Sequence, residues 1–229
     1  MRKTTTFRRR NLPHWDIPGA TYFVTACLEG SIPSLGLLDI DRQRKRLFGE
    51  PIPNGISPEE WEFQRDELLF SYADEWLDQR PAVRHLADPI LAAEVRSAIA
   101  HFEEERYEVY AYVIMASHIH WIFRPRPEWI DSQPDGGDRT PREIILHSLK
   151  RHCAYACNLL LNRTGMFWQA ESYDRVVRDE DELIRFIVYI ENNPVKAGLV
   201  KTPQDWLFSS ARERPLSQPL SLPIRMKPK

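Results

Sequence analysis

The stretch that decides the fold reads Tyr107-Glu-Val-Tyr-Ala-Tyr-Val-Ile-Met-Ala-Ser-His-Ile-His-Trp-Ile-Phe123. β-branched and aromatic residues fill both halves, and Ala116-Ser117 interrupts them. This pattern predicts two strands, Tyr107–Met115 and His118–Phe123, joined by a tight turn. The apolar run from Val113 to Phe123 is too short to span a bilayer and contains two histidines, so we expect no membrane segment.

Outward from this pair, one more strand and three helices are predicted. Gly19–Leu28 follows a Pro-Gly turn signal and is rich in strand-forming residues. Asp88 and Thr140 each precede a proline and an apolar helical pattern, which predicts helices to about Glu105 and Asn162. The expected inward residues are Ile90, Leu91, Val95, Ile99 and Phe102 in the first helix, and Ile144, Ile145, Leu149, Tyr155 and Leu159 in the second.

A short extended segment, Phe167–Val177, and a last helix, Asp179–Asn192, complete the pattern, and Pro194 is expected to end that helix. The order strand, helix, strand, strand, helix, short strand, helix predicts an α+β fold. We expect a ferredoxin-like split β-α-β sandwich with an antiparallel sheet and an extra C-terminal helix. One sheet face would carry helices, and the other would be able to accept a ligand.

The chain divides into a basic arm over residues 1–13, one domain over 14–200 and a basic tail over 201–229. Residues 30–87 form an insertion that the pattern does not place. Prolines interrupt its first half, and Glu59–Arg80 is expected to hold one or two helices.

The formal net charge of −2 conceals an uneven distribution. Residues 39–110 hold 17 acidic and 9 basic side chains, whereas residues 1–38 and 201–229 have net charges of +3 and +4. Basic ends suit a phosphate backbone and equally suit solvated tails, so charge alone leaves both interpretations open.

The three cysteines indicate reduced thiols. The basic N-terminus lacks the apolar core of a secretory signal. An odd number of cysteines without such a signal is typical of a cytoplasmic protein. Cys153 and Cys157 lie one helical turn apart, and no further cysteine completes a zinc site, so we interpret them as core residues.

His118 and His120 share one face of their predicted strand, roughly 6.6 Å apart along the chain. Two imidazoles on one strand can share a divalent cation. The alternative is a polar pair on an exposed strand face, but the apolar residues around the pair favour a specific role. The sequence contains neither His-x-His-x-Asp-His nor His-Glu-x-x-His, the motifs of two other metal hydrolase classes.

Tyr189 and Asn193 are four residues apart, so one helix face presents a phenol and a carboxamide together. A tyrosine oxygen can attack a phosphodiester, and an asparagine oxygen can serve as the third ligand of a cation. The alternative is that Tyr189 half-buries its ring and that Asn193 ends the helix before Pro194.

Taken together, these segments resemble the REP-associated tyrosine transposases, relatives of the single-tyrosine His-hydrophobe-His (HUH) transposases. The resemblance covers about Leu12 to Arg212 and is weakest over 30–87. It rests on Thr21–Thr25, Tyr107–Phe123, Phe167–Gln169, Tyr189-Ile-Glu-Asn-Asn-Pro-Val-Lys-Ala-Gly-Leu-Val200 and Trp206–Arg212. The family usually has Pro-Asn before the first histidine, where this chain has Ala116-Ser117.

The resemblance implies a metal-dependent enzyme that cuts and rejoins single-stranded DNA beside short hairpins. His118 and His120 would bind Mg²⁺ or Mn²⁺ with Asn193 as third ligand. Tyr189 would be the nucleophile and would form a 5′-phosphotyrosine. Two rival functions stay open, namely a domesticated protein that binds DNA hairpins without cutting and a metal-dependent hydrolase with no covalent step.

Single-stranded DNA also requires aromatic and cationic surfaces. The expected DNA contacts are Arg8, Arg9, Arg10, Trp121, Arg124, Lys150, Arg151, Trp168 and Arg175, with Arg126, Phe167, Tyr173 and Arg178 as further candidates. Whether the chain acts as a monomer or a homodimer does not follow from the sequence.

Overall fold

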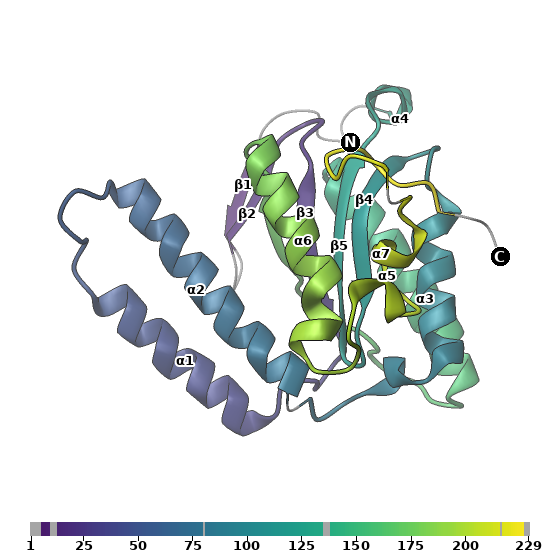
Figure 1. Cartoon of the computed structure of the whole chain (residues 1–229), viewed down its shortest axis with the longest axis horizontal. Coiled ribbons are helices and arrows are strands. Elements are labelled where there is room, and N and C mark those ends of the chain that lie inside the picture. Colours follow the sequence, from purple (N-terminus) through teal and green to yellow (C-terminus); the bar gives the residue numbers. More distant parts are fainter. Residues whose placement is uncertain (1–5, 10–12, 80, 135–137, 216, 227–229) are drawn as a thin grey trace.

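A four-stranded antiparallel sheet forms the centre of the molecule (Figure 1). The computed structural model describes residues 6–9, 13–79, 81–134, 138–215 and 217–226. The strands are β3 (Tyr22–Cys27), β4 (Tyr107–Ile114), β5 (His118–Pro125) and β6 (Tyr173–Val176), in the order β4-β5-β3-β6. Helical connections join β3 to β4 and β5 to β6, and with this strand order the arrangement is ferredoxin-like, so the predicted α+β fold is confirmed.

Helices cover both faces of the sheet. Helices α3 (Pro89–His101) and α5 (Pro141–Leu160) lie on one face, and α6 (Glu180–Lys196) lies on the other (Figure 1). Along β5, Ile119 and Trp121 join the core on the α3–α5 face, while Ile122 packs against α6. Burial on both sides explains why these strands are almost continuously apolar.

Side-chain caps begin the three helices near the residues predicted. The carboxylate of Asp88 accepts from the Ile90 amide at 2.9 Å, and that of Asp179 accepts from the Glu182 amide at 2.7 Å. Thr140 and Glu143 form a reciprocal capping box. The predicted end of α6 was wrong, because the helix continues past Pro194 to Lys196. A proline one turn from the end removes few helical hydrogen bonds, which the helix tolerates.

The buried stripe of α5 differs from the predicted one. Ile145, Leu149, Cys153 and Cys157 face the sheet, which confirms the two cysteines as core residues. Tyr155 and Leu159, expected inside, lie on the opposite side and are 74% and 70% exposed. Ile90 of α3 is likewise exposed, whereas Leu91, Val95 and Ile99 are buried as predicted.

The unplaced insertion is a helical hairpin. Its helices are α1 (Ser34–Gly49) and α2 (Pro58–Gln79), and the 3-10 turn η1 (His85–Ala87) follows before α3. The two helices run antiparallel and project from the body, with α2 on the side of α6 (Figure 1).

Both ends of the described chain have more structure than the sequence predicted. Strand β1 (Thr6–Arg9) pairs with β2 (Pro13–Asp16), where an unstructured arm was expected; residues 1–5 and 10–12 lie outside the described residues. The expected basic tail packs along β4: the Ile114 amide donates to Phe208 at 2.9 Å and the Ile224 amide to Val109 at 2.7 Å.

The remaining short elements are α4 (Pro127–Ser132), η2 (Pro203–Asp205) and α7 (Ser210–Glu213). Within the described residues, no helix has the length and apolar character needed to cross a membrane.

Candidate metal and nucleophile site

Strand β5 presents His118 and His120 on the sheet face that α6 covers. Neighbouring positions Ile119 and Trp121 point to the opposite core, as the two-residue repeat of a strand requires. On the adjacent strand β3, Thr25 pairs with His120 and Cys27 with His118. Both histidines project to the same face, so the shared-face prediction is confirmed. They are fully buried, so the face that was expected to accept a ligand is covered at this point.

A hydroxyl group orients each imidazole ring. Thr25 Oγ1 lies 2.8 Å from His120 Nδ1, and Ser117 Oγ lies 2.9 Å from His118 Nδ1. The Ser117 hydroxyl donates its proton to the Leu77 carbonyl at 3.1 Å. The Ser117 oxygen therefore acts only as an acceptor toward His118, and His118 Nδ1–H is the donor. The Nε2 atom of His118 is then unprotonated and faces Nε2 of His120 at 3.2 Å. This hydrogen bonding of Nδ1 is typical of histidines that bind a metal through Nε2.

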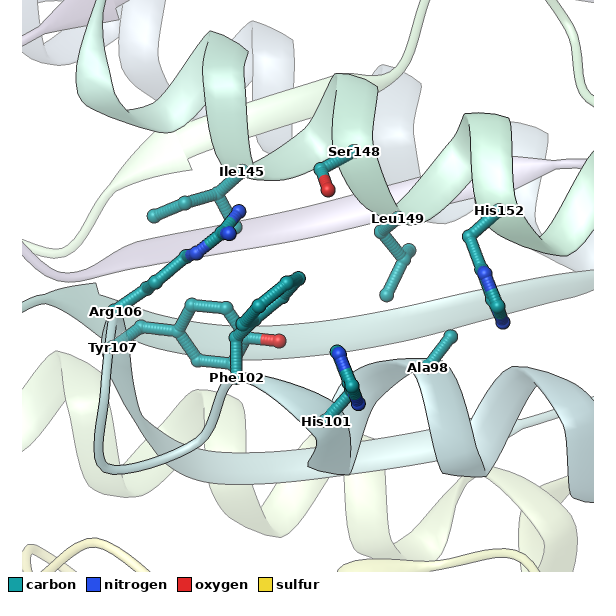
Figure 2. Close-up of a pocket in the computed structure, with 9 residues that line it drawn as sticks. All are labelled: Ala98, His101, Phe102, Arg106, Tyr107, Ile145, Ser148, Leu149 and His152. Carbon is teal, nitrogen blue, oxygen red and sulfur yellow. The ribbon is translucent and has the colours of Figure 1, made fainter.

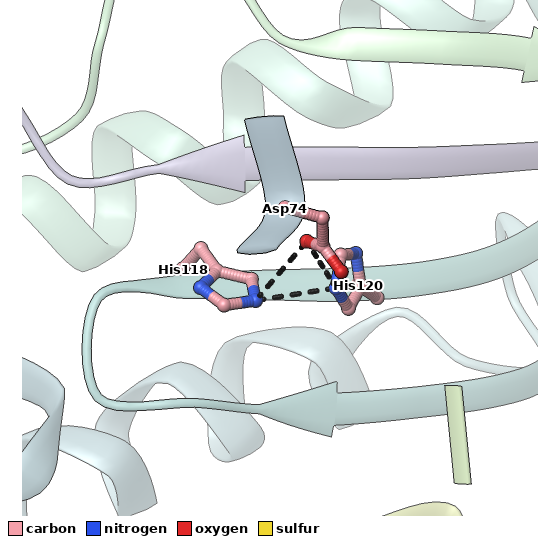
Figure 3. Close-up of side chains that lie close together, drawn as sticks. All are labelled: Asp74, His118 and His120. Carbon is pink, nitrogen blue, oxygen red and sulfur yellow. Dashed lines mark hydrogen bonds and ion pairs between the residues drawn. The ribbon is translucent and has the colours of Figure 1, made fainter. Parts of the chain in front are cut away.

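Asp74 of α2 approaches the same point from the other side (Figure 3). Its Oδ1 atom lies 3.1 Å from His120 Nε2 and 3.7 Å from His118 Nε2. The Tyr189 hydroxyl of α6 donates to Asp74 Oδ2, and the Asn193 Nδ2 atom lies 3.4 Å from that oxygen. Three distant segments therefore bring together two imidazoles, a carboxylate, a phenol and a carboxamide.

Burial and neighbouring charges shift the pKa values in this cluster. Burial, reinforced by His120, lowers the pKa of His118 to about 3, which keeps its imidazole neutral. Burial alone would raise the pKa of Asp74, but His120 and His118 outweigh it and lower the pKa. Burial and then the Asp74 charge raise the pKa of Tyr189 well above its usual value, and they raise that of Asp78 to about 7.

The donor set fits a divalent cation. Asp74, His118 and His120 offer ligand atoms that all lie within 4.8 Å of one another. The Asn193 Oδ1 atom is buried and accepts no hydrogen bond from the described residues, so it has a lone pair available for a cation. Imidazole nitrogens with carboxylate and amide oxygens form a site that suits a first-row divalent ion or Mg²⁺.

Asp74 was missed because it lies in the unplaced insertion. The sequence contains one local signal, the pair of carboxylates Asp74 and Asp78 one helical turn apart. A helix pattern says which residues share a face, but it does not say which distant strand that face meets. The contact between Asp74 and the histidines of β5 is therefore visible only in the fold.

Two of the expected DNA contacts are core residues. Trp121 is fully buried on the α3–α5 face of the sheet, and Trp168 is 5% exposed in the same core, beside Phe167. Neither indole offers a ring face to a base in this structure. The prediction named these rings as DNA contacts because aromatic residues suit both strand cores and nucleic-acid stacking.

The expected cationic contacts are scattered. Lys150 donates to the Gln169 carbonyl at 2.5 Å, and burial lowers its pKa to about 8. Arg124 of β5 pairs with Glu108 of the edge strand β4, and Arg151 is exposed on α5. Arg175 lies on β6, on the sheet face that α6 covers, and pairs with Glu182 of α6. The Arg8 and Arg9 backbones belong to β1, and Arg10 lies outside the described residues.

A separate cavity of about 210 Å³ lies between α3 and α5 (Figure 2). Its polar lining comes from His101, Arg106, Ser148 and His152, with apolar walls from Ile145 and Leu149. The sheet separates this cavity from His118 and His120, so it takes no part in the site described above.

Comparison with known proteins gives one consistent result. No family model matches the chain. A REP-associated tyrosine transposase of Escherichia coli K12 is 28% identical over 117 residues, which cover 51% of this chain and 62% of that protein. A protein of Haemophilus influenzae with the name putative REP-associated tyrosine transposase is 28% identical over 115 residues, 47% of this chain and 61% of that protein. The matched stretch thus spans about three fifths of these relatives.

A solved structure of a REP-associated tyrosine transposase bound to a REP hairpin has a similar fold. The TM-score is 0.50 at 20% identity, and the match covers 92% of this chain and 85% of that one. At this identity the likeness concerns the fold. The resemblance stated from the sequence is therefore confirmed: this chain is similar in sequence and in fold to REP-associated tyrosine transposases.

Proposed function

We propose that this chain cuts and rejoins single-stranded DNA beside short hairpins, with Tyr189 as the nucleophile. The observation that carries the proposal is the convergence of Tyr189 and Asn193 from α6 with His118 and His120 from β5. The names of the relatives support a transposase, and the REP hairpin bound in the solved relative supports hairpin DNA as the partner.

His118 and His120 are the residues that would hold Mg²⁺ or Mn²⁺ through their Nε2 atoms. Asn193 Oδ1 is the proposed third ligand, and in this conformation the Asp74 carboxylate is a further oxygen at the same point. A bound cation would withdraw charge from the scissile phosphate, which eases attack at phosphorus. Thr25 and Ser117 hold the two rings so that both Nε2 atoms face one position.

Tyr189 supplies the covalent step. Its oxygen forms a bond to phosphorus as the bond from phosphorus to the 3′ oxygen breaks, and the phenol proton goes to that leaving oxygen. The products are a 5′-phosphotyrosine and a free 3′-hydroxyl. Because the phosphodiester energy is retained, a 3′-hydroxyl from another strand can reverse the step and rejoin DNA.

The rival function is a protein that binds DNA hairpins without cutting them. One observation favours it: His118, His120 and Asn193 have no exposed surface, so a phosphate does not reach them in this conformation. A hydrolase that activates water at the same cation is the other alternative. Covalent attachment to DNA separates all three functions.

DNA is the proposed partner, and the cytoplasm is the proposed location. Cys27, Cys153 and Cys157 are unbridged thiols, which is typical of a reducing compartment. The same DNA-cutting assay, run over a range of protein concentrations, tests whether cutting needs a second copy of the chain.

The test is covalent capture. The wild type, incubated with end-labelled hairpin DNA and Mn²⁺, should give an adduct that survives a denaturing gel. Tyr189→Phe should give none while keeping hairpin binding within about twofold, because phenylalanine keeps the ring and removes only the attacking oxygen. Excess EDTA should abolish the adduct, as should His118→Ala or His120→Ala.

Tyr155→Phe is the matched control, since Tyr155 is an exposed tyrosine of α5, on the sheet face opposite to the site. It should form the adduct at a normal yield. An adduct in Tyr189→Phe, or full cutting in EDTA, would rule out the proposed mechanism. Cutting without any adduct in the wild type would favour the hydrolase, and tight hairpin binding without cutting would favour the binding protein.

A further inference from the structure

Helix α2 closes the candidate site. Asp74 contacts both histidines and the Tyr189 hydroxyl, and the Leu77 carbonyl accepts from Ser117 beside His118. An oxygen of Asp74 therefore occupies the point in front of the imidazoles where the proposed function requires an oxygen of the scissile phosphate. A DNA strand can reach that point only when α2 has moved away.

The surface beneath α2 is cationic and aromatic. The guanidinium groups of Arg175 and Arg178 lie 3.4 and 3.6 Å from the ring centre of Phe63 on α2. Further along α2, Phe70 stacks on Tyr173 of β6, with ring centroids 4.4 Å apart. Cations and ring faces in one track are the features by which proteins bind single strands without sequence preference.

The composition of α2 matches this surface. The helix has eight acidic side chains and one basic one, and its two phenylalanines lie on the face that meets β6 and α6. Asp66 lies close enough to Arg175 for the arginine charge to act on it. Carboxylates and phenyl rings thus occupy positions that phosphates and bases would take on a bound strand.

We propose that α2 is a built-in mimic of single-stranded DNA, and that the surface it covers, from Arg178 and Arg175 past Tyr173 to the histidine pair, is the path of the strand. The α1–α2 hairpin would then swing away as one unit when DNA enters. This inference rests on the proposed function for the identity of the ligand, but its test measures strand binding and not cutting.

If the hairpin competes with DNA, apparent affinity is the intrinsic affinity multiplied by the open fraction. Phe63→Ala removes the ring that both guanidinium groups contact, and should raise the open fraction without changing the path. We expect the affinity for a fluorescent single strand of deoxythymidines to rise about tenfold, equivalent to ~1.4 kcal/mol. Phe63→Ala combined with Phe70→Ala should raise it further.

Fluorescence anisotropy of the full-length chain measures this, in a Tyr189→Phe background so that no covalent step contributes. Leu68→Ala is the matched control, because Leu68 is on the same helix but is 52% exposed. If Phe63→Ala does not fold, Phe63→Leu keeps an apolar side chain and still lacks the ring face. Arg175→Ala should weaken binding in the Phe63→Ala background, since the path itself then loses a cation.

The two proposals fail separately. Unchanged or weaker strand binding in folded Phe63→Ala and Phe63→Leu would overturn the mimic, whatever the adduct assay shows. Tighter binding in these variants, with no adduct in any chain that retains Tyr189, would support the mimic and overturn the cutting mechanism. An equal gain in Leu68→Ala would also overturn the mimic, because the effect would then be general to the helix.

Discussion

Each histidine of the pair on β5 has a hydroxyl group within hydrogen-bond distance of its Nδ1 atom, which leaves both Nε2 atoms to share a cation. Thr25 acts across the strand pair and Ser117 from the turn. In the family that this chain resembles, asparagine usually occupies the position of Ser117. The Ser117 Oγ lies beside the imidazole of the next residue, His118. The departure from the family pattern thus retains a polar partner for His118.

Thr25→Val tests this orientation at one residue. Valine has nearly the same shape as threonine but cannot hydrogen bond to His120, so the ring loses its fixed orientation. We expect the affinity for Mn²⁺, measured by calorimetric titration, to fall about 10- to 100-fold. Thr21→Val, one residue before β3, is the control and should leave the affinity unchanged. Equal Mn²⁺ affinity in Thr25→Val and the wild type would contradict the assigned role.

At the scale of elements, a buried ionic network joins the N-terminal hairpin to the body. Arg142 of α5 contacts Asp16 of β2 at 2.7 Å and Asp174 of β6 at 3.0 Å, and all three side chains are at most 4% exposed. Thr140, the cap of α5, also donates to Asp16. One arginine therefore compensates two buried carboxylates on two different strands.

Arg142→Met should lower the free energy of unfolding by about 3–5 kcal/mol, because it removes the cation that two buried carboxylates share. Urea denaturation followed by circular dichroism measures the change. Lys45→Met is the control, since the Lys45–Asp41 pair on α1 is exposed and its loss should have little effect. Equal losses of unfolding free energy in Arg142→Met and Lys45→Met would show that the buried network stabilises the fold no more than an exposed ion pair does.

Sequence patterns predicted the elements that local chemistry determines. The caps Asp88 and Thr140, the start of the last helix at Asp179 and the alternation around His118 need only neighbouring residues, and all were found where expected. Packing between distant elements was not predictable, which is why Tyr155 was expected to face inward and Trp121 was named as a DNA contact. Asp74 belongs to the same class, because its role depends on where the hairpin docks.

At the scale of the whole molecule, charge is segregated. The acidic α2 lies against the candidate site, whereas the cations of the first ten residues lie at the N-terminal end of the chain. If α2 and a DNA strand compete for one path, cations outside that path can bind phosphates while the hairpin is still closed. The basic N-terminus would then contribute to binding mainly through counterion release.

Replacing Arg2, Lys3, Arg8, Arg9 and Arg10 with glutamine tests this contribution. Each phosphate of a single strand that the protein no longer neutralises lowers the slope of log K against log salt by about 0.7, so the five substitutions together account for at most roughly 3.5. We expect a clearly flatter salt dependence for hairpin DNA in anisotropy titrations, with the adduct still formed at low salt. Glutamine preserves chain length, so the pairing of β1 with β2 can persist, whereas a deletion of residues 1–10 would also remove strand β1. A slope equal to that of the wild type would mean that these cations do not bind DNA, and the path beneath α2 would then have to account for the whole electrostatic contribution to binding.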